Sequence, residues 1–149
     1  MFIWRHKILL LFVLLAAGYW YYNKAGQFGI IANPGLIIYD RIPVAFFDLY
    51  IDFDGRNLPQ DDIRDPGVRD YWWRENQAML VVPATHERTL IVGQGFAPSD
   101  EVRLTDEQGN ALRMAGVDTK VLPTRDAMRM YNTMKSAGRA VAILVRIKS

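Results

Sequence analysis

Hydrophobic and polar positions in the last quarter of the chain follow a strand–helix–strand pattern. Val117–Leu122 is a short run rich in β-branched residues. From Thr124 onward, apolar residues recur at helical spacing and charged residues take the opposite side, until Gly138 supplies a helix stop. Ala140–Val145 is then apolar without alternation, as in a strand covered on both faces. This order predicts a right-handed βαβ unit with parallel strands and a helix over 125–137.

The N-terminal half of the chain shows a β-type pattern instead. Val44–Phe53 alternates between apolar and polar positions, which predicts a half-buried strand. Asp54-Gly55 follows as a tight-turn signal, so we expect a β-hairpin there. Gly35–Tyr39 is a candidate for the first strand, and the polar segment Leu58–Val68 is expected to be a loop.

The middle of the chain is less uniform. Ala78–Pro83 and Arg88–Val92 both predict strands, the first of them ended by proline. Residues 99–116 fit either a hairpin or a short helix. Thr105 and Gln108 have the spacing of a capping box, which favours the helix, whereas the glycine at 109 favours the hairpin.

The N-terminus predicts a membrane anchor. Ile8–Tyr22 contains no charge and follows the basic Arg5-His6-Lys7. A cleaved signal peptide shares this pattern, but bulky aromatics stand where small cleavage-site residues belong. These aromatics are typical of a membrane interface belt; they are Tyr19, Trp20, Tyr21 and Tyr22.

The expected organisation is therefore a transmembrane anchor over 1–24, a tether over 25–34 and one folded domain over 35–149. The fold class predicted for this domain is α/β (α+β mixed), with a mixed, partly parallel sheet. More basic residues precede the span than follow it, so the N-terminus is predicted to be cytoplasmic and the domain extracytoplasmic, in contact with the lipid bilayer. A domain facing the cytoplasm stays an alternative.

Composition narrows the function classes. The net charge is +2 and acidic and basic residues are interleaved, so no polybasic patch indicates nucleic-acid binding. The chain has no cysteine, which excludes disulfides and thiol chemistry. His86 is the only histidine outside the N-terminal segment and cannot assemble a metal site alone. We therefore expect no metal and no cofactor.

The Gly93–Gly95 loop resembles a ligand-binding turn. It follows a predicted strand, as phosphate-cradling loops do, but lacks the third glycine of a dinucleotide fingerprint and the lysine of a P-loop. The helix beginning near Thr124 lies close to it, where α/β folds usually bind small ligands. The structural alternatives are a tight turn, a helix cap and helix-end charges. The candidate ligand or partner surface comprises Gly93, Gln94, Gly95, Thr124, Arg125, Asn132 and Arg139.

Adjacent tryptophans form a second candidate surface. Trp72 and Trp73 are consecutive, so both cannot point inward from a strand. Aromatic residues flanked by arginines favour a protein contact, whereas core packing explains at least one of the two. We treat both as candidate partner contacts.

Three motifs resemble a small domain family of largely unknown biochemistry. They are Gly93-x-Gly95, Thr124-x-x-Ala127-x-x-x-Tyr131-Asn132 and Gly138-Arg139-x-Val141-Ala142. The family includes the mitochondrial respiratory complex I assembly factor 3 and a structural-genomics domain from an archaeal methanogen. The resemblance covers about Ala78 to Ile147; Gln94 and Pro123 depart from it. It implies a helix within 99–116.

The resemblance also implies a function. It points to a non-enzymatic, membrane-anchored accessory or assembly protein that binds subunits of a membrane protein complex. The alternative is a small-ligand-binding or catalytic domain whose site lies beside Gly93–Gly95 and Thr124.

Overall fold

The computed structural model describes residues 2–83, 85–97 and 101–148, with side chains described from His6 onward. The helices are α1 (Phe2–Tyr22), α2 (Pro66–Leu80), α3 (Asp106–Met114) and α4 (Thr124–Ser136). The strands are β1 (Phe28–Asn33), β2 (Leu36–Tyr39), β3 (Ile42–Ala45), β4 (Asp48–Ile51), β5 (Asn57–Gln60), β6 (Arg88–Gly93), β7 (Val117–Leu122) and β8 (Ala140–Val145).

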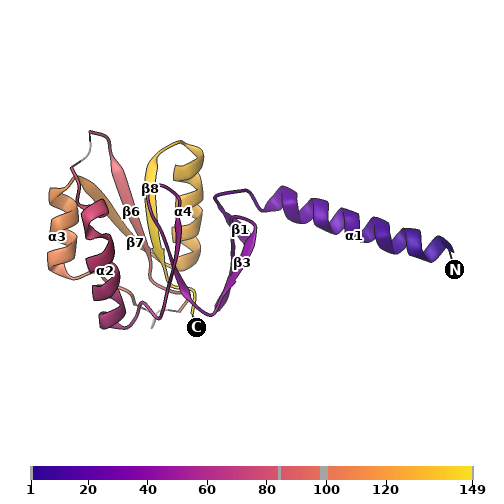
Figure 1. Ribbon diagram of the computed structural model, residues 1–149, viewed down its shortest axis with the longest axis horizontal. Helices are drawn as coiled ribbons and strands as arrows, with labels where there is room; N and C mark the ends of the chain where they lie inside the picture. The colour runs from indigo at the N-terminus through magenta and orange to yellow at the C-terminus, as the bar shows by residue number, and fades with distance from the viewer. Residues whose placement is uncertain (1, 84, 98–100, 149) are drawn as a thin grey trace.

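The main sheet has the order β5-β4-β8-β6-β7. Strands β8, β6 and β7 are parallel, while β4 runs antiparallel to both β8 and β5. Helix α4 covers one face of the sheet, and α2 and α3 cover the other (Figure 1). The prediction of one small α/β domain with a mixed, partly parallel sheet is confirmed.

The C-terminal βαβ unit lies where the sequence predicts it. Both β7 and β8 pair in parallel with β6, which lies between them. Helix α4 turns Ala127, Met128, Tyr131 and Met134 toward the sheet. Gly138 follows the helix with a φ of 70°, the left-handed conformation that ends helices most easily at glycine. The predicted stop is confirmed.

The region upstream of the main sheet differs from the prediction. Strands β1, β2 and β3 form a separate antiparallel sheet, so residues 25–34 contain a strand rather than only a tether. The alternation over 44–53 does not produce one strand, because Phe46 adopts a φ of 72° and breaks it into β3 and β4. Strand β4 then pairs with β5 through the Asp54-Gly55 turn, which confirms the expected hairpin.

The middle of the chain is more helical than the prediction. Residues 66–80 form α2, so the strand predicted over 78–83 is wrong. Asp65 caps α2 by accepting a hydrogen bond from the Gly67 N–H at 2.8 Å, and Pro66 stands at the first helical position. The capping box at Thr105 and Gln108 is present, and it starts α3 rather than a hairpin.

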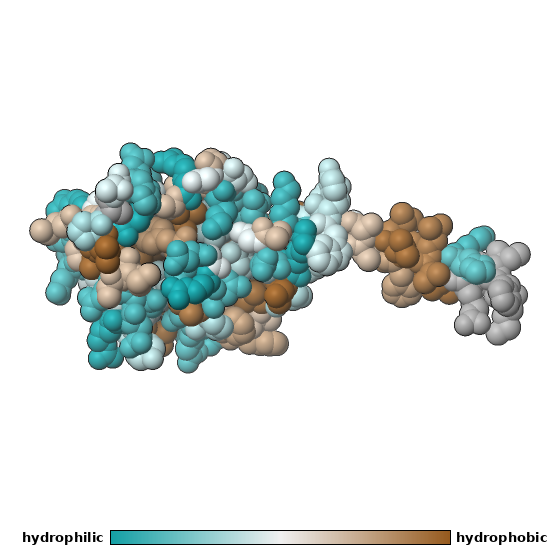
Figure 2. Space-filling view, turned by 45° about the horizontal axis from the view of Figure 1, so that its top comes forward, coloured by the Kyte–Doolittle hydropathy of each residue, from teal (hydrophilic) through white to brown (hydrophobic). Residues whose placement is uncertain are grey.

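The predicted membrane anchor is wrong. Within the described part of the chain, no helix is both long enough and apolar enough to cross a bilayer. The charge-free run from Ile8 to Tyr22 reaches about 22 Å at 1.5 Å per residue, against a hydrocarbon thickness of ~30 Å. The predictions of a single-pass membrane protein and of its topology are therefore wrong as well, whereas contact with the lipid bilayer stays a prediction. Helix α1 projects from the domain and exposes apolar side chains (Figures 1 and 2).

The aromatic residues at the end of α1 contact protein as well as solvent. The Tyr19 hydroxyl donates a hydrogen bond to the Arg41 carbonyl at 2.6 Å, and the Arg41 guanidinium lies 3.9 Å from the Trp20 ring centre. Arg41 also donates from Nε to the Asn23 carbonyl at 2.9 Å. Asp40 and Arg41 both have positive φ, as a type I′ turn between β2 and β3 requires. This turn holds the C-terminal end of α1 beside the small sheet.

Tyr21 and Tyr22 complete the predicted interface belt. Their rings meet edge to face with centres 5.2 Å apart, and both side chains are exposed. The four aromatics therefore lie at a junction between α1 and the domain, and their assignment to a membrane interface stays a prediction.

Candidate functional site

The Gly93–Gly95 loop and Thr124 are joined by hydrogen bonds at the carboxyl end of β6. The Thr124 hydroxyl accepts from the Gly95 N–H at 3.0 Å and donates to the Arg146 carbonyl at 2.8 Å. The Thr124 N–H in turn donates to the Gly95 carbonyl at 2.9 Å. Thr124 is fully buried, so its hydroxyl serves the protein itself. Pro123, not Thr124, occupies the N-cap position of α4.

The same loop is closed by tight packing. A Cβ atom on Gly93 would lie 2.8 Å from Val145 Cγ2 and 3.3 Å from both Ala127 Cβ and Thr124 Oγ1. Glycine is therefore required for α4 and β8 to approach β6. Gln94 is only partly exposed, and its N–H donates to the Leu122 carbonyl at 2.9 Å. The structure fills this end of the sheet with the chain's own groups.

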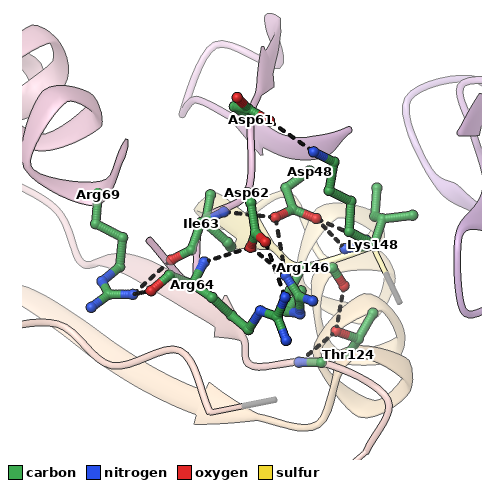
Figure 3. A network of polar contacts seen from close by, with 11 residues as sticks. Asp48, Asp61, Asp62, Ile63, Arg64, Arg69, Thr124, Arg146 and Lys148 are labelled. Carbon is green, nitrogen blue, oxygen red and sulfur yellow. Dashed lines mark hydrogen bonds and ion pairs between the residues drawn. The ribbon is translucent and has the colours of Figure 1, made fainter. Parts of the chain in front are cut away.

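A buried charged cluster continues from Thr124 toward the C-terminus (Figure 3). Arg146 and Asp48 are both fully buried, and an Arg146 nitrogen lies 3.7 Å from Asp48 Oδ2 and 2.6 Å from Asp62 Oδ1. Asp48 accepts three backbone hydrogen bonds, from Ile63, Ile147 and Lys148. The cluster ties the C-terminal segment to the loop between β5 and α2.

Two carboxyl groups of this cluster are shifted toward the ionised form. Burial raises the pKa of Asp62, but hydrogen bonds from Arg64 and the positive charge of Arg146 outweigh it, so the pKa lies below its usual value. A hydrogen bond from Lys148 likewise lowers the pKa of Asp61, which is exposed. Both carboxyls are therefore ionised near neutral pH, which suits their ion pairs with Lys148 and Arg146 and not a general-acid role.

An open groove lies between β1 and α4. Its volume is about 730 Å³, and Arg125 and Asn132 line it together with β1. The Asn132 amide donates to the Phe28 carbonyl and accepts from the Phe28 N–H, each at 2.8 Å. Arg125 donates from Nε to the Ala32 carbonyl at 3.0 Å and lies 5.5 Å from the Phe96 ring centre. The structure thus brings together two of the predicted site residues.

The remaining predicted residues are dispersed. Arg139 lies beyond α4 and pairs with Glu87 at 3.1 Å. Trp72 is fully buried against Tyr50, so its assignment as a partner contact is wrong: residues 66–80 form a helix, and the helix turns Trp72 inward. Trp73 is partly exposed on α2. Across the described residues, no group of three or more potential metal ligands gathers in one place.

Comparisons with known proteins identify the fold. No family model and no curated protein matches the chain. The solved structure of MT938 has a TM-score of 0.59 and 22% identity, covering 83% of this chain and 98% of its own. A Mth938-like domain from Bordetella pertussis has a TM-score of 0.58 and 17% identity, covering 86% and 87%. The fold is that of the Mth938-like domain.

A further solved structure with this fold is an outer membrane protein from Bartonella henselae, with a TM-score of 0.59 and 15% identity, covering 86% of this chain and 98% of that one. At such identities the likeness is one of fold. It also extends upstream of Ala78, where the sequence resemblance ended, because 83% or more of this chain is covered.

The residues that close the groove beside β1 could not be found from the sequence. Asn132 bonds the backbone of Phe28 in β1, and no side-chain pattern marks a backbone group as a partner. The two residues are also 104 positions apart in the chain. Asp48 and Arg146, the buried pair, were also missed. Their one local signal is their position at strand ends: Asp48 begins β4, and Arg146 directly follows the apolar β8.

Proposed function

We propose that this protein is a non-enzymatic accessory protein that binds a partner protein through the groove between β1 and α4. The partner class is a subunit of a protein complex under assembly, including membrane protein complexes. The resemblance of Thr124–Ala142 to the complex I assembly factor family supports the assembly role. The Mth938-like fold of the domain is compatible with it, although fold alone does not determine function.

The observation that carries the proposal is the contrast between two sites. The loop beside Thr124, where an α/β domain usually binds a small ligand, is filled by the hydroxyl and backbone groups of the chain. The groove beside β1 is open, with Ile30 70% exposed at its edge. An open groove flanked by an exposed apolar side chain favours a macromolecular partner.

A quantitative affinity purification tests this proposal. The tagged full-length chain is recovered from native cells, and an unrelated tagged domain of similar size serves as the control. The proposal expects a defined set of proteins at near-stoichiometric amounts. A chain that is recovered alone at every ionic strength would contradict it.

The alternative is a small-ligand-binding domain. A thermal-shift screen of nucleotides, cofactors and anions tests it, because a ligand present at 100 times its dissociation constant adds about 2.7 kcal/mol of stability. A shift with one of these compounds, together with recovery of the chain alone, would replace the accessory role with ligand binding.

A further inference from the structure

The outer edge of β1 is closed at its two ends and open between them. At one end the Asn132 side chain bonds both the N–H and the carbonyl of Phe28, as a neighbouring strand would. At the other end Arg125 bonds the Ala32 carbonyl. Helix α4 thus supplies two side-chain substitutes for a missing strand, and the segment between them faces the groove.

The open segment also lies outside the ladder that joins β1 to β2. Phe28 pairs with Tyr39 and Ala32 pairs with Ile37, so the register shifts across Gly29, Ile30 and Ile31. These three residues line the groove. The side chain of Ile30 is 70% exposed and that of Ile31 is 39% exposed. The segment Gly29–Ile31 therefore offers both a backbone edge and exposed apolar side chains. These are the two features that bind an added strand.

The positive charge of the groove favours an added strand that carries acidic side chains. Lys24, Arg125 and Arg129 line it, and no aspartate or glutamate does so among the described residues. Arg129 pairs with Asp126 at 3.5 Å, but both side chains are more than half exposed, so solvent screens this pair. The groove keeps a positive potential that attracts and orients carboxylates.

We infer that the groove binds an extended acidic segment of a partner protein. The segment adds beside Gly29–Ile31 as a strand, packs apolar residues against Ile30 and Ile31, and places carboxylates near the three cations. This inference rests on the proposed function and specifies the chemistry of the partner. A small anion would use the cations but would leave the two isoleucines and the strand edge without a role.

A synthetic peptide tests the inference. The probe is a fluorescein-labelled octapeptide of alternating Glu and Val, and a Lys–Val octapeptide is the charge control. We expect the acidic peptide to bind, to protect from hydrogen exchange the Ile30 amide, which alternation places on the same edge as the Phe28 N–H, and to bind less tightly as salt increases. Methylation of alternate peptide nitrogens should abolish binding, because it removes the donors of the added strand.

Two matched double variants distinguish the effect of charges in the groove from the effect of the protein's net charge. The double substitution Lys24→Glu with Arg129→Glu changes two exposed side chains, and we expect it to weaken peptide binding at least tenfold. Arg113→Glu and Lys120→Glu together change two exposed cations outside the groove and should leave binding unchanged. Failure of the acidic peptide to bind, or equal binding by both double variants, would overturn the inference.

Repeating the affinity purification with the same variants distinguishes the two proposals. Loss of the captured proteins in the Lys24→Glu, Arg129→Glu variant supports the groove as the partner site. Undiminished capture by that variant would overturn the groove inference and rule out the groove as the partner site; only an accessory role through another surface would remain. Recovery of the wild-type chain alone would contradict the accessory role itself.

Discussion

Replacement of Thr124 by valine tests whether the loop beside β6 is structural. Valine has nearly the same shape but no hydroxyl, so the Gly95 N–H loses its acceptor and the Arg146 carbonyl loses this donor. Leaving a buried polar group without its partner costs about 1–3 kcal/mol. We therefore expect Thr124→Val to lower the free energy of unfolding by about 3 kcal/mol, or roughly 6–12 °C in Tm.

Thr124→Ser is the matched control. Serine keeps both hydrogen bonds and removes one buried methyl group, which costs about 1 kcal/mol. Urea unfolding followed by tryptophan fluorescence measures both variants, because the buried Trp72 reports on the core. If Thr124→Val were within about 0.5 kcal/mol of the wild type, the hydroxyl would not be structural. Thr124 would then again be a candidate for binding a small ligand.

Three further substitutions test the packing, the charged cluster and the buried phenols. Gly93→Ala should destabilise the domain by about 1–3 kcal/mol in urea unfolding, because the new Cβ meets Val145. Asp48→Asn should cost about 3 kcal/mol in the same assay, with the exposed Asp54→Asn as control, because an amide cannot accept all three backbone hydrogen bonds. Burial raises the pKa of Tyr131, so its contribution to stability is complete below pH ~10 and is lost above it, as the unfolded chain ionises first. Tyr131→Phe should flatten the fall in urea midpoint between pH 9 and 11; an unchanged slope would contradict this.

The C-terminal half could be predicted because its signals are local. The spacing of apolar residues in α4 and the stop at Gly138 depend on a few neighbouring positions. Residues 66–83 misled the prediction because the apolar run after Ala78 looks like a strand. The Asp65-Pro66 pair, a cap followed by a first-turn proline, is the signal that identifies the helix.

The upstream region and the groove could not be predicted for a different reason. A positive φ at Phe46, a bulky residue, is not encoded in any short pattern, yet it divides β3 from β4. The pairing of Asn132 with Phe28 depends on tertiary folding rather than on either residue's neighbours. The sequence therefore does not predict which segment Asn132 bonds.

The turn at Asp40 and Arg41 connects α1 to the wall of the groove. The turn grips the helix through Tyr19, Trp20 and Asn23, and the residues that follow, Tyr22 and Lys24, form part of the groove wall. Any force that tilts α1 must therefore either break the Arg41 contacts or move that wall. The C-terminal end of α1 and the wall of the groove are therefore one continuous piece of structure, joined through Tyr22 and Lys24.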